Sequence, residues 1–338
     1  MLAFTLGCFS AAIAQKQEKV RVEKAENENS VSIYIGEKLF TRFLYPDSLE
    51  KPVLYPLHAP SGAVVTRGYP LNSTPGDPTD HPHHVGVWFN YENVNGLDFW
   101  NNSFAIPENK KYLYGWIKTD SITKTSGGSK GILAYRARWI NKQQEQLLEE
   151  STTMEFSGAA RQRIIDRTTV LKAVQDVLFK DVKDGMLGIR VAHTLQIPSK
   201  EDQKFMDDKG IVTVVKAGSD TIATGNYITS EGASGNKAWS TRARWCMLYG
   251  KIGSDSVSIT VIDHPRNPNY PTFWHARGYG LFAANPLGES VFTNGKSSKN
   301  LRLKKGESVT FRYRIIIDEN RKVISPKELN AMADAFGK

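Results

Sequence analysis

The sequence predicts an all-β protein, a large antiparallel β-sandwich with one short C-terminal helix. Apolar residues alternate with polar ones in most of its readable segments, which is the period of a half-buried strand. Only one segment has the pattern of a helix, and it lies at the end of the chain. With 338 residues, 40% of them hydrophobic, the chain can bury the core of one large domain.

The predicted strands are short, rich in β-branched or aromatic residues, and bounded by turn residues. An early strand carries Val31, Ile33 and Ile35 on one face. A late strand does the same with Val309, Phe311, Tyr313, Ile315 and Ile317. Between them we expect strands within residues 131–140, 151–158, 185–197, 210–218 and 256–265.

The C-terminal helix is predicted from its capping residues. Ser325 is the expected N-cap, Pro326 the first helical residue, and Glu328 completes a capping box. Its apolar residues fall on one face, so we expect the helix to cover a sheet: Leu329, Met332, Ala333 and Phe336. No repeat or Pro/Gly-rich linker divides the chain, which predicts a single domain over residues 15–338.

Residues 1–14 have the pattern of a signal peptide. An apolar stretch ends in Ala12-Ile13-Ala14, a small-x-small cleavage pattern before Gln15, so we expect a periplasmic or secreted protein. A lipoprotein anchored at Cys8 is the second, weaker interpretation. After cleavage Cys246 is the only cysteine, so the mature chain forms no intramolecular disulfide.

The composition of the chain limits the kinds of binding partner that we expect. No apolar run is long enough to span a membrane. The formal charge is +9, but the basic residues are scattered among acids, so we do not expect nucleic-acid binding.

Two segments hold six of the seven histidines, and both are predicted to be loops. The first, residues 46–102, contains "DHPHHVGVWFNY" and many prolines, which are unsuited to sheet interiors. The second, residues 262–288, contains "DHPRNPNYPTFWHARGYG". We expect the sandwich to bring His81, His83 or His84 within about 10 Å of His264 or His275 in one pocket.

Proton transfer is one chemistry that such a pocket supports, because imidazole titrates near neutral pH. Charged imidazoles repel one another in a desolvated cleft, so at least one should resist protonation. The candidate catalytic residues are His81, His83, His84, His264, His275 and Glu231. The candidate substrate-binding residues are Arg67, Trp88, Asp98, Trp100, Trp274 and Arg277. The tryptophans suit the C–H face of a sugar, whereas Arg190, inside a strand pattern, is expected to be structural.

Metal binding is the alternative chemistry. In an extended segment His81 and His83 point to the same side, and His264 could supply a third ligand to a divalent ion. The acid-base interpretation requires no cofactor.

The motifs "TRGYP", "DHPHHVGVWFNYENVNGLDFW", "KDGMLGIRVA", "SEGASG", "RARWCMLYG" and "DHPRNPNYPTFWHARGYGLFAANPLG" resemble those of the bacterial PmoA-like family, domain of unknown function 6807. Asp184 departs from the family, which we expect to favour Glu there. The resemblance implies a galactose-mutarotase-like supersandwich and an association with sugar-processing proteins. The family's older label, methane oxygenase, implies copper and a membrane complex, which a chain with no spanning segment does not favour.

These observations favour an exported enzyme that acts on a sugar or glycoside, including an oxidised keto-sugar, as a hydrolase, lyase or epimerase. A sugar dehydrogenase that acts first is the candidate partner. The alternatives are a non-catalytic carbohydrate-binding module and a metal-dependent oxygenase.

Overall fold

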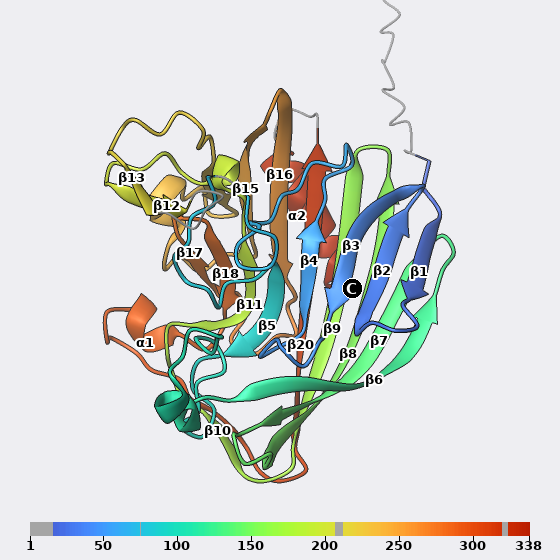
Figure 1. Ribbon diagram of the computed structural model, residues 1–338, viewed down its shortest axis with the longest axis vertical. Helices are drawn as coiled ribbons and strands as arrows, with labels where there is room; N and C mark the ends of the chain where they lie inside the picture. Colours follow the sequence, from blue (N-terminus) through green and yellow to red (C-terminus); the bar gives the residue numbers. More distant parts are fainter. Residues whose placement is uncertain (1–15, 75, 207–211, 320–323) are drawn as a thin grey trace, which may run out of the picture.

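Two eight-stranded antiparallel sheets face each other across a shared hydrophobic core (Figure 1). The computed structural model describes residues 16–74, 76–206, 212–319 and 324–338. In spatial order, the first sheet contains β1 (Val20–Lys24), β2 (Ser30–Ile35), β3 (Lys38–Leu44), β4 (Val53–Leu57), β5 (Val87–Tyr91), β11 (Gly185–Arg190), β18 (Leu281–Asn285) and β17 (Phe273–Ala276). The second contains β14 (Asn226–Thr229), β15 (Trp245–Ile252), β16 (Asp255–Asp263), β20 (Ser308–Glu319), β9 (Gln162–Ala173), β8 (Gln146–Ala159), β7 (Gly131–Ile140) and β6 (Trp116–Ser126).

Short elements connect and flank the sheets. Two small ribbons are formed by β10 (Val177–Phe179) with β19 (Leu301–Leu303), and by β12 (Gln203–Met206) with β13 (Val212–Val215). The helical elements are η1 (Glu108–Leu113), η2 (His193–Leu195), η3 (Gly235–Ala238), α1 (Glu289–Phe292) and α2 (Pro326–Phe336). None of the described helices is long and apolar enough to cross a membrane. The predicted all-β sandwich with a C-terminal helix is confirmed.

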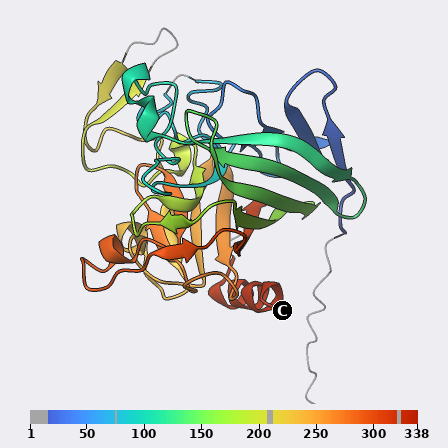
Figure 2. The ribbon, with the colours of Figure 1, turned by 90° about the horizontal axis from the view of Figure 1, so that it is seen from below.

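Side chains of β20 point alternately to the two faces of the second sheet, and so β20 contacts both the first sheet and α2. Phe311, Tyr313, Ile315 and Ile317 face the core between the sheets, while Ile316 points to the opposite side. There α2 covers the second sheet from outside, and its capping box forms as predicted (Figure 2). The proposed signal peptide lies outside the described residues.

The prediction that residues 46–102 form one loop is wrong, because this segment contains β4 and β5 in the middle of the first sheet. All five residues of β5 are buried, since loops cover its outer face as well. A strand that is buried on both faces loses the polar-apolar alternation by which it could be recognised.

The outer face of the first sheet carries the base of the candidate site. The strand register places Val53, Trp88, Gly188, Ala283 and His275 side by side across five strands. A Cβ atom on Gly188 would lie 2.5 Å from Trp88 Cζ2, so only glycine allows the Trp88 ring to lie flat over β11.

Candidate functional site

Three histidines of the first segment gather above Trp88, and we call His81, His83 and His84 the histidine cluster. The His84 ring stacks on Trp88, with centroids 5.2 Å apart. His81 stacks on His84 at 4.8 Å, and His83 meets His84 edge-on at 4.3 Å. The other face of this arrangement is closed by Tyr279 from the second segment, whose ring lies 5.0 Å from that of His81.

Arg67 holds this segment in place from behind. Its Nη1 donates to the carbonyl oxygens of Pro78 at 3.0 Å and Asp80 at 2.6 Å. Its Nη2 donates to those of His81 and His84, both at 2.9 Å. Arg67 was expected to bind substrate, but it is only 1% exposed. Its role is therefore to position the histidine cluster.

Asp80 and His81 form a hydrogen-bonded pair. The Asp80 carboxylate contacts His81 Nδ1 and accepts hydrogen bonds from Arg190 Nη2 at 2.5 Å and Arg67 Nη1 at 3.2 Å. Burial alone would raise the pKa of Asp80, but the His81 bond and the two arginine charges outweigh it and hold the pKa well below its usual range. The carboxylate is therefore charged at neutral pH and fixes the orientation of the imidazole.

His81 is the accessible member of the cluster. Its side chain is 40% exposed, and because Nδ1 faces Asp80, Nε2 is available on the opposite side of the ring. Its backbone has φ 49°, a left-handed conformation that is unusual for a residue other than glycine. Such conformations are common at functional sites.

The other two histidines are neutral. Burial lowers the pKa of His83 and of His84, and the charge of Lys51 lowers that of His83 further. Arg190 Nη1 lies 3.3 Å from His84 Nδ1 and can only donate, so this nitrogen carries no proton.

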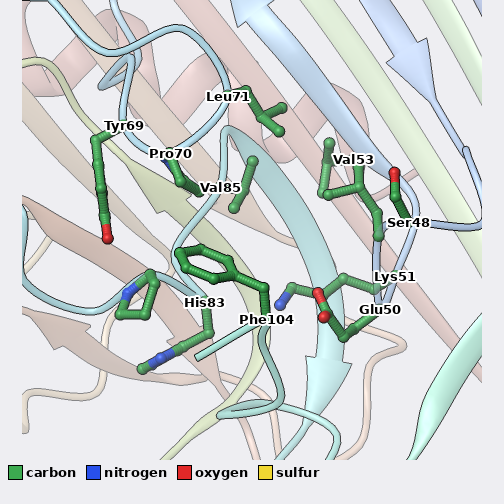
Figure 3. Close-up of a pocket in the computed structure, with 12 residues that line it drawn as sticks. Ser48, Glu50, Lys51, Val53, Tyr69, Pro70, Leu71, His83, Val85 and Phe104 are labelled. Atoms are coloured by element: carbon green, nitrogen blue, oxygen red, sulfur yellow. The ribbon is translucent and has the colours of Figure 1, made fainter. Parts of the chain in front are cut away.

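Cavities lie on both sides of the cluster. One of about 310 Å³ is lined by His83 and Lys51 (Figure 3). A second, of about 630 Å³, is lined by Asp80, Arg190 and Tyr279. A third, of about 750 Å³, shares Tyr279 with the second and extends it toward Trp239 and Arg277. The second and third cavities therefore form one groove, and Asp80 lies in its wall.

His275 forms a separate pair with Asp184. His275 Nδ1 lies 3.2 Å from Asp184 Oδ1, and Asp184 Oδ2 lies 3.0 Å from Lys183 Nζ. Burial and the charge of Asp184 raise the pKa of nearby Glu92 to about 7. His275 lies on the same sheet face as Trp88, but it is 1% exposed and lines none of the three cavities. His275 is linked to the histidine cluster through Asp184, whose negative charge acts on His83 and opposes the lowering of its pKa.

The structure places other predicted residues outside the groove. Trp274 is fully buried between the sheets, because alternation in β17 turns it away from His275, and its Nε1 donates to the Ala243 carbonyl oxygen. His264 follows β16 of the second sheet and contacts Phe336 of α2. Glu231 is exposed in the turn after β14 and accepts a hydrogen bond from the Ser230 hydroxyl.

Three further predictions need correction. Trp88 and Trp100 are each 1% exposed beneath His84, so they support the cluster and cannot stack on a sugar. Asp98 accepts hydrogen bonds from the backbone N–H and side-chain amide of Asn101, which makes it a turn-forming residue. The proposed metal set of His81, His83 and His264 is not assembled, and the described residues contain no group of three or more potential ligands placed to hold a metal ion.

Tyr279 and Lys51 were not among the residues predicted from the sequence, and Arg190 was expected to be structural. Arg190 lies within the apolar pattern of a strand, β11, so nothing in the sequence indicated that its guanidinium binds the Asp80 carboxylate. Tyr279 stands between two glycines, a signal for a ligand-facing loop that could have been used. Nothing local distinguishes Lys51 from a surface lysine.

The chain belongs to the family of unknown function DUF6807, whose model matches residues 30–334. This confirms the family resemblance and provides no support for the methane oxygenase label. No curated protein matches the sequence. Among solved structures, a galactose mutarotase-like protein from Clostridium acetobutylicum aligns with 10% identity and a TM-score of 0.39, over 89% of this chain and 99% of that one. A galactose mutarotase related enzyme from Lactobacillus acidophilus aligns with 9% identity and a TM-score of 0.30, over 90% and 99%.

Proposed function

We propose that this member of the DUF6807 family is a carbohydrate-active enzyme in which His81, oriented by Asp80, transfers protons. The observation that carries the proposal is the geometry of this pair: a charged, doubly arginine-bound carboxylate holds Nδ1 of a half-exposed imidazole. In such a pair the carboxylate positions the ring and stabilises its protonated form, while Nε2 takes or gives the proton.

The neighbouring groove suits a sugar. It offers polar groups from Asp80, Asp202 and Arg277 beside the aromatic rings of Tyr279 and Trp239. The hydroxyl groups of a sugar pair with these polar groups, and the C–H face of a pyranose packs on the Trp239 ring. The reaction classes that need only a positioned acid-base group are hydrolysis, elimination and epimerisation, and none of them requires a cofactor for the role we give His81.

Screening the purified protein against glycosides and their keto derivatives tests the proposal. We expect turnover that His81→Gln and Asp80→Asn each reduce by about 10²- to 10⁴-fold, because general acid-base catalysis contributes on this scale. His264→Gln is the matched control and should retain activity, since His264 lies against α2. A protein that binds sugars but turns over none of them would instead be a binding module.

We also propose export, with cleavage after Ala14. Mass spectrometry of periplasmic or secreted material should find a mature chain that starts at Gln15. An intact Met1 there would contradict the signal-peptide assignment.

A further inference from the structure

Lys51 lies just before β4 with its side chain buried. The residue is 4% exposed, and its Nζ lies 5.9 Å from the centroid of the Trp88 ring. Figure 3 shows the side chain extending into the cavity of about 310 Å³, toward the side on which His83 and Phe104 lie. The amine is thus presented to the cavity.

This amine has no direct partner. Within the described ranges, no hydrogen bond or ion pair involves Lys51 Nζ, although the Glu50 and Asp98 charges act on it from a longer distance. Burial nevertheless lowers its pKa only to about 8, so the ammonium form predominates at pH 7. An ammonium that faces a cavity from a mostly buried side chain, with no hydrogen-bond acceptor among the described residues, is placed to bind an anionic ligand.

The cavity walls define what kind of ligand fits. The neutral His83 imidazole and the Tyr69 hydroxyl can donate further hydrogen bonds, and Leu49, Leu71 and Val85 provide apolar contacts. An ammonium with nearby neutral donors and apolar walls suits a carboxylate attached to a compact carbon skeleton.

We propose that Lys51 binds the carboxylate of an acidic sugar, so that the substrate of this protein is a uronic acid or a glycoside of one. The inference rests on the proposed carbohydrate function and names its substrate class. His83 lines this cavity and its ring lies 5.6 Å from the His81 ring, so a glycoside whose carboxylate is bound at Lys51 can extend past His81 toward the groove on the other side of the cluster.

Calorimetric titration of the full chain at pH 7 tests this proposal. It compares the affinities for D-glucuronate and D-galacturonate with those for D-glucose and D-galactose. We expect the wild type to bind at least one uronate at least tenfold more tightly than the matching neutral sugar. Lys51→Met should abolish this preference and leave the affinity for the neutral sugar unchanged. Lys124→Met is the matched control, because Lys124 is exposed on β6, and it should bind as the wild type does.

A second measurement needs no variant and so remains decisive if Lys51→Met fails to fold. The affinity of the wild type for uronates should fall as the pH rises from 7 to 9.5, because the Lys51 ammonium loses its proton around pH 8. The affinity for neutral sugars should not change in this range. The other titratable groups that face Lys51 or line this cavity are Glu50, His83, Asp98 and Tyr69.

The outcomes separate the two proposals. Equal affinity for uronates and neutral sugars, or a uronate preference that survives in Lys51→Met, overturns the role of Lys51 and leaves the carbohydrate function intact. Failure to bind any sugar of either kind overturns both.

Discussion

The rings of His81 and Tyr279 stack with their centroids 5.0 Å apart and an angle of 1° between their planes. This contact joins the two segments that hold most of the histidines, and it does so through an imidazole and a phenol instead of through two imidazoles. Arg190 lies against the same tyrosine ring at 5.0 Å and holds Asp80. Tyr279 therefore packs against both His81 and the arginine that holds Asp80.

Replacing Tyr279 tests whether this contact positions His81. We expect Tyr279→Leu to lower kcat about 10- to 100-fold, because a displacement of about 1 Å at a catalytic group has effects of this size. Tyr279→Phe keeps the ring and should stay close to the wild type. Equal losses in both variants would show that the hydroxyl matters and the stacking does not.

Arg67 should be a stability determinant. Arg67→Met leaves four carbonyl oxygens, two of them buried and two half-buried, and part of the Asp80 carboxylate without their donor. Such a loss lowers the free energy of unfolding by about 3–5 kcal/mol. Urea denaturation measures it, with Arg136→Met on the exposed side of β7 as the control, expected within about 0.5 kcal/mol of the wild type. A loss below about 1 kcal/mol in Arg67→Met would contradict the positioning role.

Stability should fall between pH 7 and pH 5 because of His84. Its pKa in the folded protein is well below the ordinary 6.5, so only the unfolded chain takes up a proton in this range. The stabilising contribution is present above pH 6.5 and decreases by about 2 kcal/mol by pH 5. His84→Phe should reduce the difference between urea unfolding at the two pH values by that amount, whereas an unchanged difference would mean that His84 is protonated in the fold.

The aromatic surface for a sugar should be Trp239, which lines the groove, and not Trp274. Trp239→Ala should weaken neutral-sugar binding about tenfold, or about 1.4 kcal/mol, through loss of the stacked ring. Trp274→Phe should lower stability and leave sugar affinity unchanged, since this residue lies in the core. Calorimetry and urea denaturation together distinguish the two effects, and weakened binding in Trp274→Phe alone would reverse the assignment.

Local patterns predicted the β-sandwich because each depends on only a few neighbouring residues. The alternation of Phe311, Tyr313, Ile315 and Ile317 reflects one buried strand face, and the Ser325 and Glu328 capping box forms from residues three positions apart. The sequence also indicated that the segments around His81 and His275 are unusual, since clusters of imidazoles and prolines are visible without any structure.

Only the tertiary structure decided which of these residues act together. Alternation along β17 turned Trp274 into the core and His275 outward. The pairing of β11 with β5 brought Arg190 to Asp80, which lies in the loop before β5. Lys51 became a candidate ligand-binding residue because the fold buried it without a partner. Burial and contacts between distant segments depend on how the sheets pack, whereas a local pattern records only the chemistry of neighbours along the chain.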